Sequence, residues 1–167
     1  MKSLLLWWVC LGAGAGAFAC ESKSKQAESS VAVAAEPMGA AECATCNMVV
    51  REQPAPRAQL VHRDGTRAHF CSIGDMLPYL ASPSPHGKAE HIFVEVMSAE
   101  EDPESTSTAE HPWTPAAGAS YVVGVKRPKV MGAPVLSYAA SDVAKQVAER
   151  HSAQVKSFEQ LRQPSAP

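Results

Sequence analysis

The sequence predicts an α+β protein made of two small ββαβ units packed together. Short runs rich in β-branched and aromatic residues are separated by turn signals, as is typical of strands. In each half of the chain, a serine precedes an apolar stretch with helical character. The order strand, strand, helix, strand therefore occurs twice, without obvious sequence identity between the two copies.

The first unit is predicted at residues 43–112, which include a connection at the end of the unit. A strand and its return strand flank Asp64-Gly65, a strong hairpin signal. Ser72 can cap the helix that follows, and Pro78 should keep that helix short or distorted. The expected elements are strands at 58–64, 67–70 and 91–97 and a helix from 72 toward 80.

The second unit is predicted at residues 113–167. A connection that contains proline and glutamate, residues 100–115, separates its strands from those of the first unit. Ser141 can cap a helix that carries small and β-branched apolar residues along one face. The expected elements are strands at 120–125, 134–138 and 155–158 and a helix beginning at Ser141.

Residues 1–19 are typical of an export signal. Lys2 precedes an apolar run of about 15 residues, shorter than the roughly 20 that a membrane-spanning helix needs. The run ends in Ala17-Phe18-Ala19-Cys20, which looks like a lipobox, although Ala17 stands where bacterial lipoproteins usually have leucine. We expect lipid on Cys20, and the alternative is ordinary cleavage near Ala19, which would leave Cys20 as a free thiol.

Residues 20–42 are predicted to form a flexible tether. The segment 21–30 is polar and lacks large apolar residues, so it cannot bury enough surface to offset the entropy of ordering. Glu21, rather than aspartate, follows the anchor. In a Gram-negative cell this pattern resembles a lipoprotein sent on to the outer membrane, where it faces the periplasm.

Composition and motifs exclude several classes of function. The formal net charge is −2, and no basic run of the kind that grips phosphates occurs, so nothing favours a nucleic-acid partner. The sequence contains no nucleophile elbow, Walker loop, zincin helix or dinucleotide fingerprint. We therefore expect a protein that is not an enzyme.

Sulfur is concentrated in the segment Cys43-Ala44-Thr45-Cys46-Asn47-Met48. Two thiols and a thioether are soft ligands, which favour Cu(I) over magnesium or calcium. In an extended segment, side chains two positions apart lie on the same face. Cys46 and Met48 can then approach one ion together while Asn47 points away.

With these residues placed, the chain resembles the NosL family of copper-binding lipoproteins, which assist the maturation of nitrous-oxide reductase. The resemblance covers nearly everything after the tether, and several ordered motifs are more specific than any one of them. Asn47 departs from it, because the family typically has glycine at that position. The matching motifs are Cys43-x-x-Cys46-x-Met48, Phe70-Cys71-Ser72 with Asp75, Ile92-Phe93-Val94 with Met97, His111-Pro112, Tyr121-Val122-Val123-Gly124 and Met131-Gly132.

We expect Cys46 and Met48 to bind the Cu(I) ion, with a third ligand from elsewhere in the chain. Met131 is the first candidate, because the resemblance includes Met131-Gly132 at a predicted turn of the second unit. Cys43 is the next candidate. His111 follows, favoured over the other histidines only because it belongs to the His-Pro motif.

The cysteines also admit other interpretations. Without Cys10 and Cys20 of the export signal, three of the five remain, an odd number for an exported protein. Cys43 and Cys46 could form a disulfide with each other or with Cys71. Cys71 closes a strand, where burial as a small apolar residue is the commoner fate of a thiol.

The combined expectation is a periplasmic metallochaperone that is tethered to the membrane, holds Cu(I) at an exposed sulfur site and releases it by ligand exchange. The resemblance implies nitrous-oxide reductase, or the membrane complex that assembles it, as the recipient. The alternative is a periplasmic thiol-disulfide redox protein that uses Cys43 and Cys46. That class usually places its Cys-x-x-Cys at the start of a helix, whereas this motif follows a polar tether.

Overall fold

The computed structural model describes residues 33–130 and 132–163 of the 167-residue chain. The predicted export signal, the predicted lipidation site Cys20 and the candidate ligand Met131 lie outside these residues. Within the two described ranges, no helix combines the length and the apolar character that crossing a bilayer would require.

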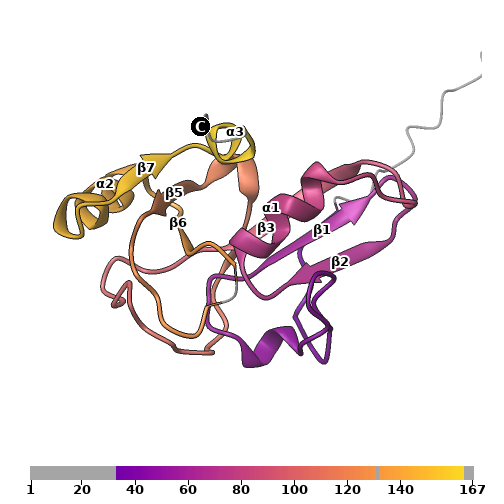
Figure 1. Ribbon diagram of the computed structural model, residues 1–167, viewed down its shortest axis with the longest axis horizontal. Coiled ribbons are helices and arrows are strands. Elements are labelled where there is room, and N and C mark those ends of the chain that lie inside the picture. Colours follow the sequence, from indigo (N-terminus) through magenta and orange to yellow (C-terminus); the bar gives the residue numbers. More distant parts are fainter. Residues whose placement is uncertain (1–32, 131, 164–167) are drawn as a thin grey trace, which may run out of the picture. The chain divides into compact units, whose positions relative to one another are not determined.

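The first sheet is antiparallel and consists of β1 (Ala58–His62), β2 (Arg67–Phe70), β3 (Ala89–Glu95) and β4 (Trp113–Pro115). Its strand order is β2-β1-β3-β4 (Figure 1). The β1–β2 turn contains Gly65 with φ 86°, a left-handed value that glycine adopts without steric cost. Directly after β2 comes α1 (Ile73–Ala81), and its first turn is fixed by the Ser72 hydroxyl, which accepts the Asp75 N–H at 3.0 Å.

The second sheet is antiparallel and consists of β5 (Ser120–Val123), β6 (Val135–Tyr138) and β7 (Gln154–Lys156). Its strand order is β6-β5-β7, and α2 (Ser141–Arg150) packs against it (Figure 1). Both units follow the order strand, strand, helix, strand. The predicted α+β class is therefore confirmed.

Several elements differ from the sequence-based expectation. The connection contains β4, which pairs with β3 in the first sheet, although residue 113 was placed at the start of the second unit. The predicted last strand ends at Lys156, and α3 (Phe158–Arg162) follows it with a capping box formed by Ser157 and Gln160. Ser141 is the first residue of α2 rather than its cap. Short 3-10 turns, η1 (Val50–Glu52) and η2 (Ala116–Gly118), complete the described elements.

The two sheets are joined where β3 runs on toward β6. Met97 and Tyr138 form an isolated parallel bridge, and the Met97 N–H donates to the Ser137 carbonyl at 2.9 Å. The Ser137 hydroxyl in turn donates to the Glu95 carbonyl. Backbone pairing therefore continues from one sheet to the other.

The folded part of the chain begins earlier than expected, because Met38 belongs to it. Met38 is 2% exposed and packs in the core cluster of the first sheet, whereas the sequence assigned it to a flexible segment. Glu36 is also held, because its N–H and carbonyl both hydrogen-bond the buried Gln59 side chain, at 3.0 and 2.8 Å. The chain is thus anchored to β1 several residues before Cys43.

A buried ion pair holds the connection against the first sheet. Arg57 and Glu95 are both 0% exposed, and the guanidinium meets the carboxylate in two contacts of 2.7 Å. The same guanidinium donates to the carbonyls of Arg51, Thr108 and Ala109. One buried cation therefore ties η1, β3 and the end of the connection together.

Candidate metal centre

The segment that carries Cys43, Cys46 and Met48 forms a small closed loop beside the first sheet (Figure 1). Glu42 and Val49 pair as an antiparallel bridge and close the loop. Cys43 pairs with His69 of β2 as a parallel bridge, and the Ala44 N–H donates to the His69 carbonyl at 2.9 Å. This pairing brings the loop to the strand that leads into Cys71.

The backbone between Cys46 and Met48 turns sharply. The Asn47 N–H donates to the Cys43 carbonyl at 2.8 Å, and the Cys43 N–H donates to the Met48 carbonyl at 2.9 Å. Asn47 has φ 62°, a left-handed value that asparagine tolerates better than most residues. The expectation of an extended segment is therefore wrong, and Asn47 adopts a backbone conformation for which glycine is the usual residue.

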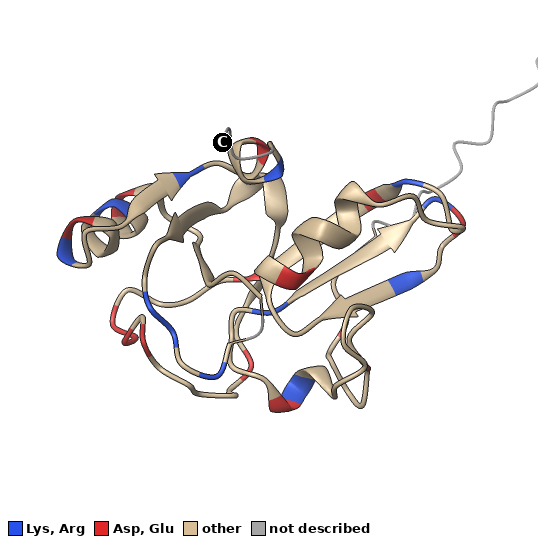
Figure 2. Cartoon of the chain, viewed as in Figure 1, with Lys and Arg blue, Asp and Glu red and all other residues tan. Residues whose placement is uncertain are grey.

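Three sulfurs and a carboxylate converge where this loop meets the start of α1. One candidate ligand atom from each of Cys43, Cys46, Cys71 and Asp75 lies within 4.8 Å of the other three. The sulfurs of Cys46 and Cys71 are 3.6 Å apart, and the Thr45 hydroxyl donates to the Asp75 carbonyl at 3.2 Å. Asp75 is the acidic residue in the first turn of α1, and Figure 2 shows how acidic and basic residues are distributed along the described chain.

The thiols of this cluster differ in their access to solvent. Cys43 and Cys71 are each 1% exposed, whereas Cys46 and Met48 are half-buried and pack against the same core cluster. Among the described residues, Cys43, Cys46 and Cys71 are all free thiols, so the disulfide alternative is not formed here. An ion arriving from solvent would therefore meet Cys46 before the buried sulfurs.

The local environment shifts the pKa values of Cys43, Cys71 and Asp75 in different directions. Burial raises the pKa of Cys43, but the N–H groups of Cys71, Thr45 and Cys46 donate toward its sulfur, and the net effect lowers that pKa. Burial raises the pKa of Cys71, and its contacts with Cys46 and Cys43 raise it further. Burial also raises the pKa of Asp75. The surroundings thus favour negative charge on Cys43 and disfavour it on Cys71 and Asp75, and a bound cation would offset the cost of those two charges.

A glycine pair brings the second unit against this cluster. A Cβ added to Gly74 would lie 2.1 Å from the Ala133 carbonyl oxygen, and one added to Gly132 would lie 2.7 Å from Asp75 Oδ1. Neither position has room for a side chain. The chain immediately after Met131 therefore passes directly over the first turn of α1.

The structure brings together some of the predicted ligands and leaves others apart. Cys43 and Cys46 belong to the cluster, and Met48 lies in the same loop. His111 is not free to bind a metal ion, because both ring nitrogens have partners. Its Nε2 lies 2.6 Å from Glu101 Oε2, and its Nδ1 lies 2.9 Å from the Ala109 carbonyl oxygen. Cys71 is buried, as expected, but its sulfur also faces the other thiols.

Sequence reasoning missed Asp75 as a cluster member and placed Cys71 only in the core. The available signal was the odd number of cysteines together with Phe70-Cys71-Ser72 and Asp75, which had been noted only as a motif at the start of the helix. A carboxylate three residues after a helix cap is usually interpreted as a residue that stabilises the first turn. Its proximity to Cys43 and Cys46 arises from tertiary pairing alone.

The fold and the cluster together define an α+β protein with a sulfur-rich centre suited to a soft metal ion. A sequence profile of the NosL family matches residues 34–166 of the chain. The chain therefore belongs to the NosL family, and the resemblance found in the sequence is confirmed.

Individual proteins are also similar to this chain. The copper-binding lipoprotein NosL of Stutzerimonas stutzeri is 32% identical over 124 residues, which cover 73% of this chain and 62% of that protein. The crystal structure of the copper chaperone NosL from Shewanella denitrificans matches with a TM-score of 0.63 at 22% identity, over 75% of this chain and 93% of that one. The solution structure of apo-NosL from Achromobacter cycloclastes matches with a TM-score of 0.46 at 24% identity, over 61% of this chain and 82% of that one.

Proposed function

We propose that this protein is a metallochaperone that carries Cu(I) as its cargo and passes it to a recipient by ligand exchange. The observation that carries the proposal is the half-buried Cys46, whose sulfur lies within 4.8 Å of the buried Cys43 sulfur in a loop that also contains Met48. Soft sulfur ligands favour Cu(I). The names of the Stutzerimonas stutzeri and Shewanella denitrificans relatives support the same choice of metal.

Cys46 and Met48 are the proposed principal ligands, with Met131 and Cys43 as further ligands. Gly132, the neighbour of Met131 in the chain, approaches Asp75 Oδ1 and supports Met131 as the ligand from the second unit. Cys43 lies behind Cys46 and can share the ion without being reached from solvent. A site with one accessible side suits transfer, because an incoming ligand can replace Met48 or Cys46 in turn.

The proposed location is the periplasmic face of the outer membrane, with lipid on Cys20 as the anchor. The name of the Stutzerimonas stutzeri relative, a lipoprotein, supports an anchor of this kind. Residues 20–32 would separate the anchor from the folded part. The proposed recipient is nitrous-oxide reductase or the membrane complex that assembles it.

Replacing Met48 with leucine tests the copper site with little change in side-chain volume. The reduced protein should bind about one Cu(I) in an anaerobic titration against a competing chelator. Met48→Leu should weaken binding about tenfold or more, because it removes a thioether ligand and keeps an apolar side chain. Met97→Leu is the matched control, since Met97 is buried in the second core cluster, and it should leave the affinity unchanged.

Equal affinities for wild type and Met48→Leu would contradict the proposed ligand set. Measuring the reduction potential of the same variant addresses the alternative of a thiol-disulfide protein that uses Cys43 and Cys46, whose sulfurs lie within 4.8 Å of each other. A protein that works by thiol exchange should keep its reduction potential in Met48→Leu. A chaperone should instead lose copper affinity.

A copper-transfer assay tests whether nitrous-oxide reductase, with its assembly complex, receives the ion. The Cu(I)-loaded protein, mixed with copper-free nitrous-oxide reductase and its assembly complex, should restore nitrous-oxide reduction faster than an equal amount of chelated Cu(I). The reason is that ligand exchange within a protein complex avoids release of the ion to solvent. Equal rates with protein-bound and chelated copper would argue against delivery and leave a role in copper storage.

A further inference from the structure

Asp75 carries a buried oxygen for which the copper proposal has no use. The residue is 7% exposed, and its Oδ2 atom has no hydrogen-bond partner. Only Arg127 Nε and Tyr138 Oη share this condition among the side chains of the described residues. An unpartnered carboxylate oxygen away from water is costly unless a proton or a cation meets it.

The surroundings of the Asp75 carboxylate favour a cation. Candidate ligand atoms of Asp75 and of Cys43, Cys46 and Cys71 all lie within 4.8 Å of one another. In a tetrahedral zinc site with Zn–S bonds of about 2.3 Å, two sulfurs are about 3.8 Å apart. The Cys46 and Cys71 sulfurs, at 3.6 Å, already have nearly that separation. Closing the remaining gaps requires shifts of about 1 Å or less.

The backbone prepares the cluster for negative charge. The Cys71 N–H donates to Cys43 Sγ at 3.5 Å, and the N–H groups of Thr45 and Cys46 also point to that sulfur. Such donors stabilise a metal-bound thiolate. The cap by Ser72 and the contact of Thr45 with the Asp75 carbonyl fix the first turn of α1 beside them. The four ligands are thus held by backbone pairing rather than by flexible side chains alone.

The ligand set selects a different metal from the copper site. A carboxylate oxygen is a hard ligand that Cu(I) does not favour, whereas three thiolates with one carboxylate suit a divalent ion in tetrahedral geometry. We propose that Cys43, Cys46, Cys71 and Asp75 form a second, four-ligand site for a divalent cation of the zinc type. Met48 and Met131 take no part in it.

Because the two proposed sites share Cys43 and Cys46, they cannot be filled together. A divalent ion in the four-ligand site would occupy the accessible sulfur and block uptake of Cu(I). The two shared cysteines can therefore bind either metal. The thioethers of Met48 and Met131 would complete the copper site, and Cys71 and Asp75 would complete the divalent site. The divalent site itself does not depend on delivery of copper to any recipient.

Cobalt(II) is the probe, since it takes the same tetrahedral sites as zinc and is coloured. The reduced, metal-free protein should bind one equivalent of Co²⁺ and show thiolate charge-transfer bands and the intense visible bands of tetrahedral cobalt, which Zn²⁺ then removes. Asp75→Asn and Cys71→Ser should weaken Co²⁺ binding about tenfold or more and leave Cu(I) affinity within about threefold. Met48→Leu should show the reverse pattern.

Asp142→Asn is the matched control, because Asp142 is the exposed carboxylate in the first turn of α2, and its Co²⁺ binding should equal that of wild type. X-ray absorption of the zinc-loaded wild type adds a measurement that needs no variant to fold. It should show three sulfurs at about 2.3 Å and one oxygen at about 2.0 Å. The absence of tetrahedral bands in wild type, a shell of nitrogen and oxygen alone, or wild-type affinity in Asp75→Asn would each overturn the proposal.

Discussion

Cys46→Ser is expected to weaken Cu(I) binding about a hundredfold or more. Cys46 is the half-buried cysteine of the cluster, and its replacement removes the one cysteine sulfur that an ion can reach from solvent. Loss of a group that only supports a metal ligand typically costs 10-fold to 100-fold in affinity, so loss of the ligand itself should cost about that much or more. Serine keeps the size of the side chain but offers a hard oxygen that Cu(I) does not favour.

The same variant should also lose Co²⁺ binding, because the two proposed sites share this sulfur. Cys71→Ser is the matched comparison, with the same chemical change 3.6 Å away, and it should lose Co²⁺ while keeping Cu(I). Chelator competition with each metal measures both affinities. Retention of Cu(I) by Cys46→Ser at wild-type affinity would show that the copper ligands are elsewhere.

Local sequence patterns predicted the elements that depend on neighbours in the chain. The Asp64-Gly65 turn, the Ser72 cap and the repeated order of strands and helix all follow from periodicity and turn chemistry. The capping box at Ser157 and Gln160 was also visible, but the stretch before it has strand character and concealed the short helix that begins at Phe158. Boundaries were thus less predictable than the elements themselves.

The composition of the cluster could be predicted only in part. Cys43, Cys46 and Met48 stand out because they are close in sequence and chemically alike. Cys71 and Asp75 join them through the bridge between Cys43 and His69, a contact that no local pattern encodes. Burial of Cys71 was predictable, but burial does not say which side chains its sulfur will meet.

The buried charges were not anticipated either. Glu95 lies at the end of β3, among apolar residues. The sequence pattern of this run predicts only a strand and assigns no role to the charge. A charge in such a position is rare unless it is paired, so the strand itself held a signal for a buried partner. The identity of that partner, Arg57, depends on the register between β1 and β3, in which Ala58 faces Val94.

Glu95→Gln is expected to lower the free energy of unfolding by about 3–5 kcal/mol, because it leaves the Arg57 guanidinium buried without its counter-charge. The Glu95 carboxylate accepts the Nε–H and an Nη2–H of Arg57 and also the Arg57 backbone N–H at 2.9 Å. A glutamine amide would turn its own N–H groups toward at least one of these donors. The loss should appear as a lower midpoint in urea unfolding of the metal-free protein, with a similar dependence on urea concentration.

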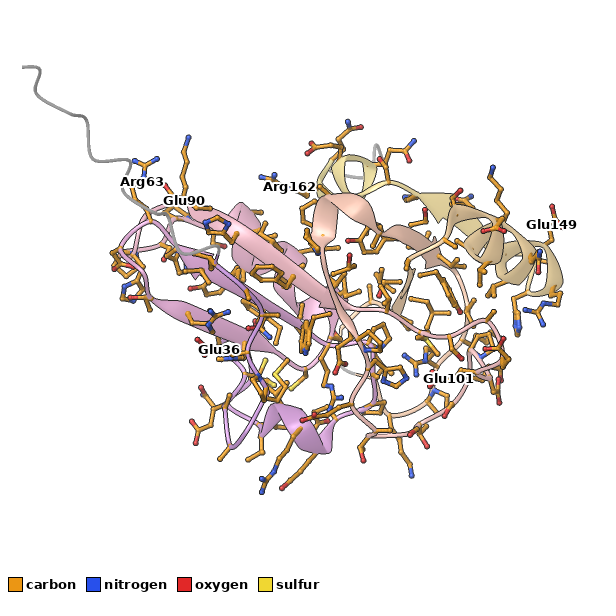
Figure 3. The ribbon with its side chains drawn as sticks, turned by 180° about the vertical axis from the view of Figure 1, so that it is seen from behind. Glu36, Arg63, Glu90, Glu101, Glu149 and Arg162 are labelled. Carbon is orange, nitrogen blue, oxygen red and sulfur yellow. The ribbon has the colours of Figure 1, made fainter. Side chains whose placement is uncertain are left out.

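An exposed ion pair between Arg63, directly after β1, and Glu90 of β3 provides the control. Arg63 and Glu90 are 3.0 Å apart but their side chains are 69% and 46% exposed, and Figure 3 shows them together at the surface. Glu90→Gln removes the same kind of charge and should cost about 1 kcal/mol or less, since water replaces the lost partner. Equal losses for Glu95→Gln and Glu90→Gln would mean that Arg57 reaches solvent when its partner is removed, and that the connection is not pinned by a desolvated charge.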